Sequence, residues 1–209
     1  MSARFVIFGS GGFGRELILP AQQMLAAADA SKEVVFASDG GGPPVGGRPH
    51  IRAEEIADED EVVIAVGDSG IRRDISARVG GRAGKLIAPS AVIGPDVELA
   101  EGAVLCGYTM VTASARIGRQ FQCNIYSYVA HDCVIGDFVT FAPRVCCNGN
   151  VHIHDGAYIG TGAVLKQGTA GAPLVIGEGA VVGMGAVVTR SVPPGAVVIG
   201  NPAKPLARA

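Results

Sequence analysis

The chain has 209 residues and no tryptophan, and aromatic residues make up only 5% of it. Yet 48% of its residues are apolar, and 31 are glycine, so its cores must be built from Val, Ile, Leu and Ala. This composition favours strands and tight corners over helix bundles. The net charge is only −2, without long basic runs, so we do not expect binding to nucleic acid or to a charged membrane surface.

Long hydrophobic runs are missing as well. No apolar stretch reaches the ~18 residues that span a bilayer, and the start of the chain, MSARFVIFGSGG, lacks the charged region and cleavage site of a signal peptide. The five cysteines form no C-x-x-C pair, and four of them occupy positions of the repeat described next that elsewhere hold Ile, Val or Ala. We therefore expect small core residues in a reducing compartment, the cytoplasm.

A six-residue repeat dominates the second half of the chain. Steps of six from Ile87 to Leu165 meet fourteen residues, all apolar, which by chance happens on the order of once in 30,000 trials. The position four residues further on is mostly small or β-branched. Three such units of 18 residues close one triangular coil, with the large apolar residue inside. The pattern resembles hexapeptide-repeat proteins, which implies a left-handed parallel β-helix, interrupted here by a loop at 167–173.

The chain therefore divides into an α/β domain over 1–84 and a β-helix domain over 85–209. In the first domain we predict strands at 4–8, 33–37 and 61–66, a helix from the glycines to about residue 29 with Pro20 as a kink or break, and a second helix at 69–79. This order predicts a small parallel sheet of the Rossmann-like, dinucleotide-binding type. We expect this domain to cover one end of the β-helix.

Gly9, Gly11 and Gly14 match G-x-G-x-x-G between the first strand and the first helix. Such a turn lets a backbone approach a phosphate at a helix N-terminus, although a glycine turn can also be purely structural. Asp39 follows the second strand, where an acidic residue meets a ribose or base. About 80 residues are too few for a full dinucleotide fold, so we predict that one nucleotide diphosphate binds here.

His131 is the third residue of its hexad, so its side chain should point outward near a corner, next to Asp132. A histidine beside a carboxylate suits general-base catalysis. Gly149 lies 18 residues further on, so it should sit roughly 5 Å away on the next coil, where its N–H can meet a substrate oxyanion. The alternative is that His131 is simply a solvated corner residue.

His152 and His154 form H-x-H on one expected strand. Two histidines on one strand can bind a metal, but no third ligand stands at a fitting spacing, so we predict surface residues and no metal site.

Four segments together resemble one family: GSGGFGREL, IAVGDSGIRRDI, AHDCVIGDF with Gly149-Asn150, and the ending GNPAKPL. They resemble the bacterial nucleotide-sugar N-acetyltransferases, which include the bacillosamine and perosamine acetyltransferases and sialic-acid O-acetyltransferase-like proteins. The resemblance covers nearly the whole chain.

The resemblance implies that acetyl-CoA donates an acetyl group to the 4-amino group of a UDP- or GDP-linked amino-deoxy sugar, by direct attack without an acyl-enzyme. In this family His131 matches the general base, Asp132 its acidic neighbour, and Gly149 the backbone donor to the thioester carbonyl. Asn124 matches an Asn near the reacting groups, and Thr161 and Met184 match residues along the CoA arm. Lys204 matches a lysine at a CoA phosphate, and Gly67 and Asp68 match residues at the base or ribose.

The resemblance also implies a homotrimer with active sites between subunits. Three other functions stay open from the sequence. They are O-acetylation of a sialic-acid-type sugar, a non-catalytic sugar-nucleotide-binding scaffold, and a carbonic anhydrase-like enzyme, which needs three histidines around zinc.

Overall fold

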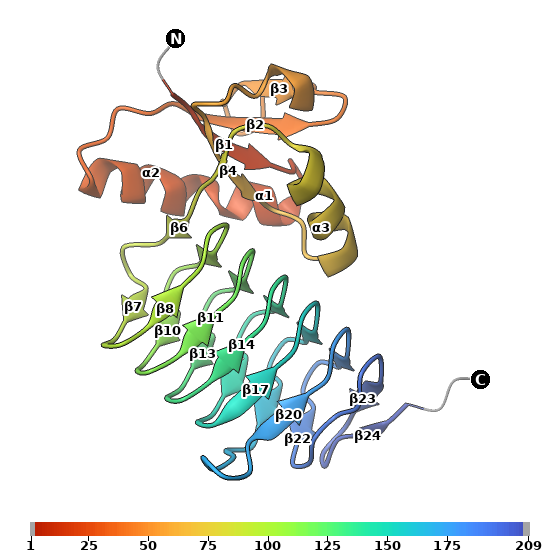
Figure 1. The fold of residues 1–209 in the computed structure, drawn as a ribbon. Coiled ribbons are helices and arrows are strands. Elements are labelled where there is room, and N and C mark those ends of the chain that lie inside the picture. The colour runs from red at the N-terminus through yellow and green to blue at the C-terminus, as the bar shows by residue number, and fades with distance from the viewer. Residues whose placement is uncertain (1–2, 207–209) are drawn as a thin grey trace.

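The computed structural model describes residues 3–206, as an α/β part followed by a parallel β-helix (Figure 1). The helices are α1 (Gly12–Glu16), α2 (Ile18–Ala27) and α3 (Ser69–Arg78), with a 3-10 turn at Ala53–Glu55. The first strands are β1 (Phe5–Phe8), β2 (Val34–Ser38), β3 (His50–Arg52), β4 (Glu61–Ile64) and β5 (Arg82–Ala83).

These five strands form one parallel sheet in the order β3-β2-β1-β4-β5. Side chains along β1 alternate between its two faces. Phe5 and Ile7 pack with Leu17 and residues of α2, whereas Val6 and Phe8 pack with Ile75 of α3. The order reverses between β1 and β4, so the carboxyl ends of these two strands open beside each other.

The α/β part differs from the sequence prediction in three details. The first helix breaks at Leu17 rather than at Pro20, which is accommodated in the first turn of α2, where its missing N–H matters little. Strands β3 and β5 were not predicted, since they are three- and two-residue edge strands without a buried apolar run.

The β-helix has three parallel sheets, here named PB1, PB2 and PB3. PB1 contains β6 (Leu86–Ile87), β9 (Val104–Leu105), β12 (Gln122–Cys123), β15 (Thr140–Phe141), β18 (Tyr158–Ile159), β21 (Val181–Val182), β23 (Val197–Ile199) and β24 (Lys204–Pro205), of which only β24 is antiparallel to its neighbour. PB2 contains β7 (Val92–Ile93), β10 (Met110–Val111), β13 (Tyr128–Val129), β16 (Cys146–Cys147), β19 (Val164–Leu165) and β22 (Val187–Val188). PB3 contains β8 (Glu98–Leu99), β11 (Arg116–Ile117), β14 (Val134–Ile135), β17 (Val151–Ile153) and β20 (Leu174–Ile176).

The strand register has the 18-residue spacing that the hexads predict. Met110 pairs with Tyr128, and Tyr128 pairs with Cys146 on the following coil. Beyond the predicted loop the spacing grows, because Val164 pairs with Val187. The segment 166–173 therefore adds five residues to the corner between PB2 and PB3.

The corners turn through single residues in the left-handed backbone region, one every six residues. Most positions of this kind between 96 and 150 are not glycine, and they include Asp96, Tyr126, Asp132 and Asn150, with φ between 55° and 60°. Asp and Asn tolerate this conformation because their short polar side chains bond locally.

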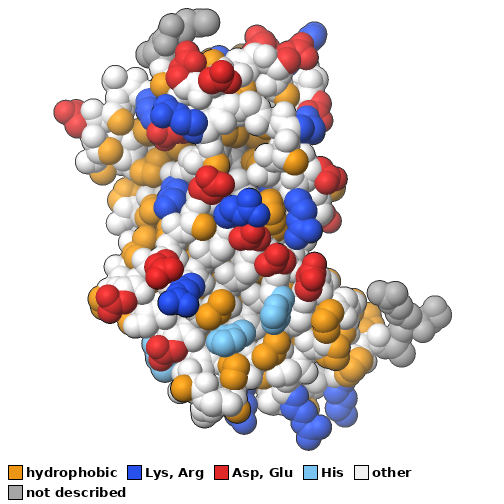
Figure 2. Space-filling view, in the orientation of Figure 1, with side chains coloured by type: hydrophobic (Ala, Val, Ile, Leu, Met, Phe, Trp, Pro, Cys, Tyr) orange, Lys and Arg blue, Asp and Glu red, His pale blue; other side chains and the backbone are white. Residues whose placement is uncertain are grey.

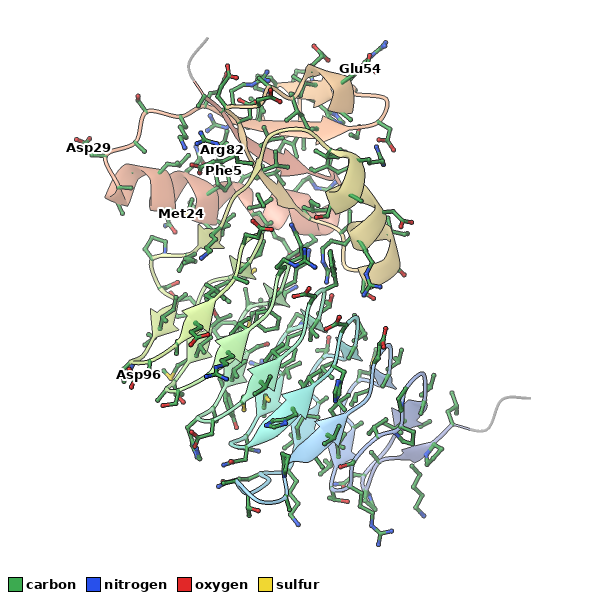
Figure 3. The ribbon with its side chains drawn as sticks, in the orientation of Figure 1. Phe5, Met24, Asp29, Glu54, Arg82 and Asp96 are labelled. Carbon is green, nitrogen blue, oxygen red and sulfur yellow. The ribbon has the colours of Figure 1, made fainter. Side chains whose placement is uncertain are left out.

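The predicted inward residues form a continuous core from Leu105 to Val188. The α/β part does not cover the end of this core, contrary to our expectation: it packs on the outer face of PB1 through Leu86 and Val104, and Ile93 in the first coil stays 38% exposed. Met24 points from α2 toward the β-helix (Figure 3), where its sulfur accepts a hydrogen bond from the Ile87 N–H. Within residues 3–206, none of the helices has the length and apolar character of a membrane span.

Candidate functional site

His131 lies at the corner between PB2 and PB3, and its imidazole is about half exposed. Its Nδ1 is 2.7 Å from Asp132 Oδ2. Asp132 occupies the left-handed corner position, with φ 58°, and its carboxylate reaches back to the preceding ring. A carboxylate accepts a hydrogen bond, so Nδ1 carries the proton and the Nε2 lone pair is left free.

Gly149 stands one coil further along, against the same ring. A Cβ built on Gly149 would lie 2.5 Å from both Cε1 and Nε2 of His131, closer than any real contact of this kind. Only glycine at this position leaves the imidazole where it is. Among the described residues nothing accepts a hydrogen bond from the Gly149 N–H, while its carbonyl accepts one from Gly168 N–H at 2.9 Å. Gly168 belongs to the 166–173 loop, so that loop borders the His131 corner.

Buried cysteine side chains lie behind His131, on the inner side of the corner. Cys133 points into the core, with its Sγ 4.0 Å from that of Cys147 and 3.2 Å from the Asn148 carbonyl oxygen. The hydrogen bond to Cys133 and complete burial raise the pKa of Cys147 well above its usual value. These thiols face inward, away from the outer side of the corner where the imidazole lies. The corner thus presents one free imidazole nitrogen and one free N–H, which suit proton abstraction and oxyanion binding.

Asn124 is not part of this cluster within one chain. It precedes Ile125 at the corner between PB1 and PB2, and its side-chain oxygen accepts a hydrogen bond from the Ile125 N–H. Sheet PB2 separates this corner from that of His131. Thr161 and Met184 lie at the same corner as Asn124, on later coils, and are linked by the bond from Gly185 N–H to the Thr161 carbonyl.

Lys204 lies on β24 at the C-terminal end of PB1, and its side chain is exposed. Met184 is also exposed, to 80%. Neither side chain has a hydrogen-bond partner within residues 3–206, so the far end of the β-helix presents a free apolar side chain and a free cation.

The predicted glycine loop lies where β1 meets α1. Gly9 has φ 108°, which a side chain would strain, and a side chain on Gly14 would collide with the Gly9 carbonyl. Gly11 precedes α1 and has open space around it. Gly9 and Gly14 are therefore required by close packing, and Gly11 is the one with room for a ligand.

Gly67 and Asp68 follow β4, beside this loop in the sheet order. The Asp68 carboxylate caps α3 by accepting the Ile71 N–H at 2.8 Å. Asp39 follows β2, and its carboxylate forms a two-pronged ion pair with Arg78 at 2.7 and 2.9 Å. The two aspartates thus already have partners within the chain, which the sequence did not suggest.

Arg72 is the residue that sequence reasoning missed. In the segment SGIRRDISARV the helical period puts Ile71 and Ile75 on one buried face, but the structure leaves Ile71 54% exposed and buries Arg72 completely. Its guanidinium bonds both to the loop after β4 and to the β-helix. A single sequence contains no signal for this inversion.

The two histidines of the H-x-H motif lie on different surfaces. His152 is on the outer face of PB3, paired in register with Val134 and Val175, whereas His154 is exposed at the corner between PB3 and PB1. Across residues 3–206, no three His, Cys, Asp or Glu side chains converge as metal ligands. On the face drawn in Figure 2, basic and acidic side chains are interspersed rather than gathered by sign.

Comparison with known proteins gives close matches over the whole chain, although no family model matches it. The GDP-perosamine N-acetyltransferase of Escherichia coli O157:H7 is 42% identical, over 97% of this chain and 96% of that protein. The solved structure of WeeI from Acinetobacter baumannii AYE is 46% identical, with a TM-score of 0.90 over 98% of this chain and 100% of that one. The acetyltransferase domain of PglB from Neisseria gonorrhoeae FA1090, solved with acetyl coenzyme A, is 30% identical, with a TM-score of 0.84 over 99% and 100%.

Proposed function

The chain belongs to the family of acetyl-CoA-dependent nucleotide-sugar N-acetyltransferases, and from that premise we propose that it acetylates the 4-amino group of a GDP-linked amino-deoxy sugar. The nucleotide is assigned from the E. coli relative, whose name specifies a GDP-sugar. The single observation that carries the chemistry is the His131 corner, where a carboxylate-bound imidazole has a free Nε2.

In the proposed reaction the sugar amine attacks the thioester carbonyl of acetyl-CoA. His131 Nε2 accepts the proton that the amine nitrogen loses, and Asp132 holds the ring and stabilises the imidazolium. The Gly149 N–H donates to the oxyanion of the tetrahedral intermediate. The C–S bond then breaks, the CoA sulfur takes the proton from the His131 imidazolium and leaves as the thiol, and the acetamido sugar remains. No cysteine takes part.

The two halves divide the substrates between them. Residues 1–84, as a Rossmann-like domain, hold the nucleotide with Gly9, Gly11, Gly14, Asp39, Gly67 and Asp68. Residues 85–209, as a left-handed β-helix, hold acetyl-CoA along Thr161 and Met184, with Lys204 at a phosphate. The support is that Gly11 has open space beside the β4 loop, and that Thr161 and Met184 share one exposed corner with Asn124.

We further propose a homotrimer with active sites between subunits. Asn124 and His131 stand at different corners of the prism with PB2 between them, so one chain cannot bring both to the same amine. Two copies packed side by side can, because the Asn124 corner of one copy then faces the His131 corner of its neighbour.

The test is a thiol-release assay with acetyl-CoA against GDP-, UDP- and dTDP-linked 4-amino sugars, with His131→Ala run beside the wild type. We expect CoA release with the GDP-linked sugar, reduced about 10²–10⁴-fold in kcat by the substitution. Release that falls less than tenfold in a folded variant would remove His131 as the base. Release only with hydroxyl acceptors of the sialic-acid type would instead support O-acetylation, and no release with any acceptor would indicate a binding protein.

A further inference from the structure

Arg72 of α3 is fully buried where the α/β part meets the β-helix, and no carboxylate of residues 3–206 lies within hydrogen-bond distance of it. Every partner of its guanidinium is a neutral oxygen. On the α/β side the partners are the carbonyls of Val66 at 2.6 Å and Gly67 at 3.2 Å. On the β-helix they are carbonyls of three residues, Gln120, Phe138 and Val139, and the side-chain oxygens of Gln122 and Thr140, at 2.7–3.4 Å.

Such a group is expensive to bury. Burial lowers the pKa of Arg72 to about 10, so the guanidinium is still charged at neutral pH. Replacing a buried charge and its partners by apolar groups is often neutral or stabilising, so stability alone does not account for an arginine here. The planar guanidinium does supply something that apolar packing cannot, because it donates hydrogen bonds in several fixed directions at once. It fixes the β4 loop relative to coils of PB1.

The hydrogen bonds of Arg72 to the β4 loop and to PB1, here called the clamp, also set the direction of the backbone groups in the β4 loop. In a planar trans peptide the N–H points opposite to the preceding carbonyl. The Val66 and Gly67 carbonyls point at Arg72, and Thr140 Oγ1 donates a second bond to the Gly67 carbonyl at 2.9 Å. The N–H groups of Gly67 and Asp68 must therefore point away from the β-helix. Within residues 3–206 neither finds an acceptor, so both are free to donate to a nucleotide.

We propose that Arg72 is a positioning residue for acetyl transfer. It aims two backbone donors at the nucleotide and fixes the angle at which the nucleotide domain meets the β-helix that carries the acetyl donor. This inference rests on the proposed function, because it assumes that the sugar is anchored on one part and acetylated on the other. A displacement of about 1 Å at a reacting centre can lower a rate about 10²-fold.

The variants are Arg72→Met and Arg72→Lys, with Arg73→Met as the matched control. Arg73 neighbours Arg72 on α3 and also touches the β-helix, with its guanidinium carbon 5.1 Å from the centroid of the Phe138 ring, but it makes no hydrogen bond to a carbonyl of residues 3–206. We expect kcat/KM for the nucleotide sugar to fall about 10²-fold in both Arg72 variants, while the Kd for CoA, measured by calorimetry, stays within twofold. The control should keep both quantities within twofold of wild type.

Thr140→Val covers the case in which the Arg72 variants do not fold. It removes both the bond to the Gly67 carbonyl and one acceptor of the Arg72 guanidinium, and it nearly preserves the shape of the side chain. We expect a three- to tenfold fall in kcat/KM with an unchanged Kd for CoA. An unchanged kcat/KM in Thr140→Val together with a folded and fully active Arg72→Lys would overturn the inference. An equal loss of CoA affinity in these variants would overturn it too, since that indicates general damage.

Hydrogen exchange separates failure of the Arg72 inference from failure of the proposed function. If wild type transfers acetyl to no nucleotide sugar, the proposed function fails, but the clamp can still be tested. Arg72→Lys should then speed exchange in the peptide covering residues 66–76 and leave β1 unchanged. Unchanged exchange at 66–76 would refute the clamp itself.

Discussion

Replacing Gly149 by alanine tests the geometry of the proposed catalytic corner directly. Gly149 has an ordinary backbone conformation, so alanine introduces no backbone strain. Its methyl group, however, would stand 2.5 Å from two atoms of the His131 ring. The ring is at the end of a flexible side chain and half exposed, so it will swing outward rather than push the coil apart.

The expected effects on stability and on rate are therefore very different. Moving the ring breaks the bond between His131 and Asp132, an exposed pair whose loss costs about 0–1 kcal/mol of folding stability. The same movement takes the proposed base away from the amine, so kcat should fall by about 10²–10⁴, as it would without the imidazole.

The assay is CoA release under saturating acetyl-CoA, with thermal unfolding measured on the same samples. The matched control is Gly107→Ala, which occupies the same hexad position but faces only the hydroxyl of Ser90, at 3.2 Å. We expect the control to keep its rate. A Gly149→Ala enzyme within threefold of wild type would refute the reasoning, because the ring would then tolerate a neighbour that the geometry excludes.

Three further predictions follow from single contacts. Asp132→Asn keeps the shape of the side chain but removes the charge that holds the ring, so kcat should fall about 10- to 100-fold, measured by the same assay. Burial alone would raise the pKa of Asp60, but hydrogen bonds from Arg4 and Ala57 hold it below its usual value. The stabilisation is thus present above the pKa of the unfolded chain and lost as pH falls through the lower folded value. Asp60→Asn should cost about 1.5–3 kcal/mol at pH 7, and urea melts should show this difference shrinking below about pH 4; a constant difference would contradict the assignment. Cys146 is the only one of the five cysteines that is not buried, and burial raises the pKa of Cys106 to about 12. A thiol reagent at pH 8 should label one thiol quickly in native protein and none in Cys146→Ser, and rapid labelling of a second site would contradict the buried arrangement.

The solenoid was predictable because its signal is repeated. Fourteen apolar residues spaced by six define the coil, and the 18-residue pairing and the predicted loop at 167–173 both follow from them. The small strands β3 and β5 could not be predicted, because their positions depend on partners across the sheet and not on their own residues. The side-on packing of the α/β part on PB1 was also invisible, since outward residues such as Leu86 and Val104 resemble any other strand residue.

Some residues of the candidate site could likewise be predicted from the sequence, and others could not. His131 and Gly149 meet because 18 residues close one coil, and counting alone predicts their contact. The separation of Asn124 from His131 was also within reach of counting, since seven residues exceed one hexad and therefore pass a corner. Arg72 was out of reach, because a charged residue in an amphipathic helix predicts solvent, and only the oxygens around it explain its burial.

The partly exposed first coil gives the solenoid a weak end and a strong middle. A stack of coils opens one unit at a time, as a zipper does, so amides near Ile93 should exchange at a lower opening free energy than those further along. The coil that carries His131 has neighbours fixed on both sides, through β10 and β16 on PB2. Opening of the first coil therefore does not reach the proposed base, and His131 and Gly149 keep their spacing while the end of the β-helix opens locally.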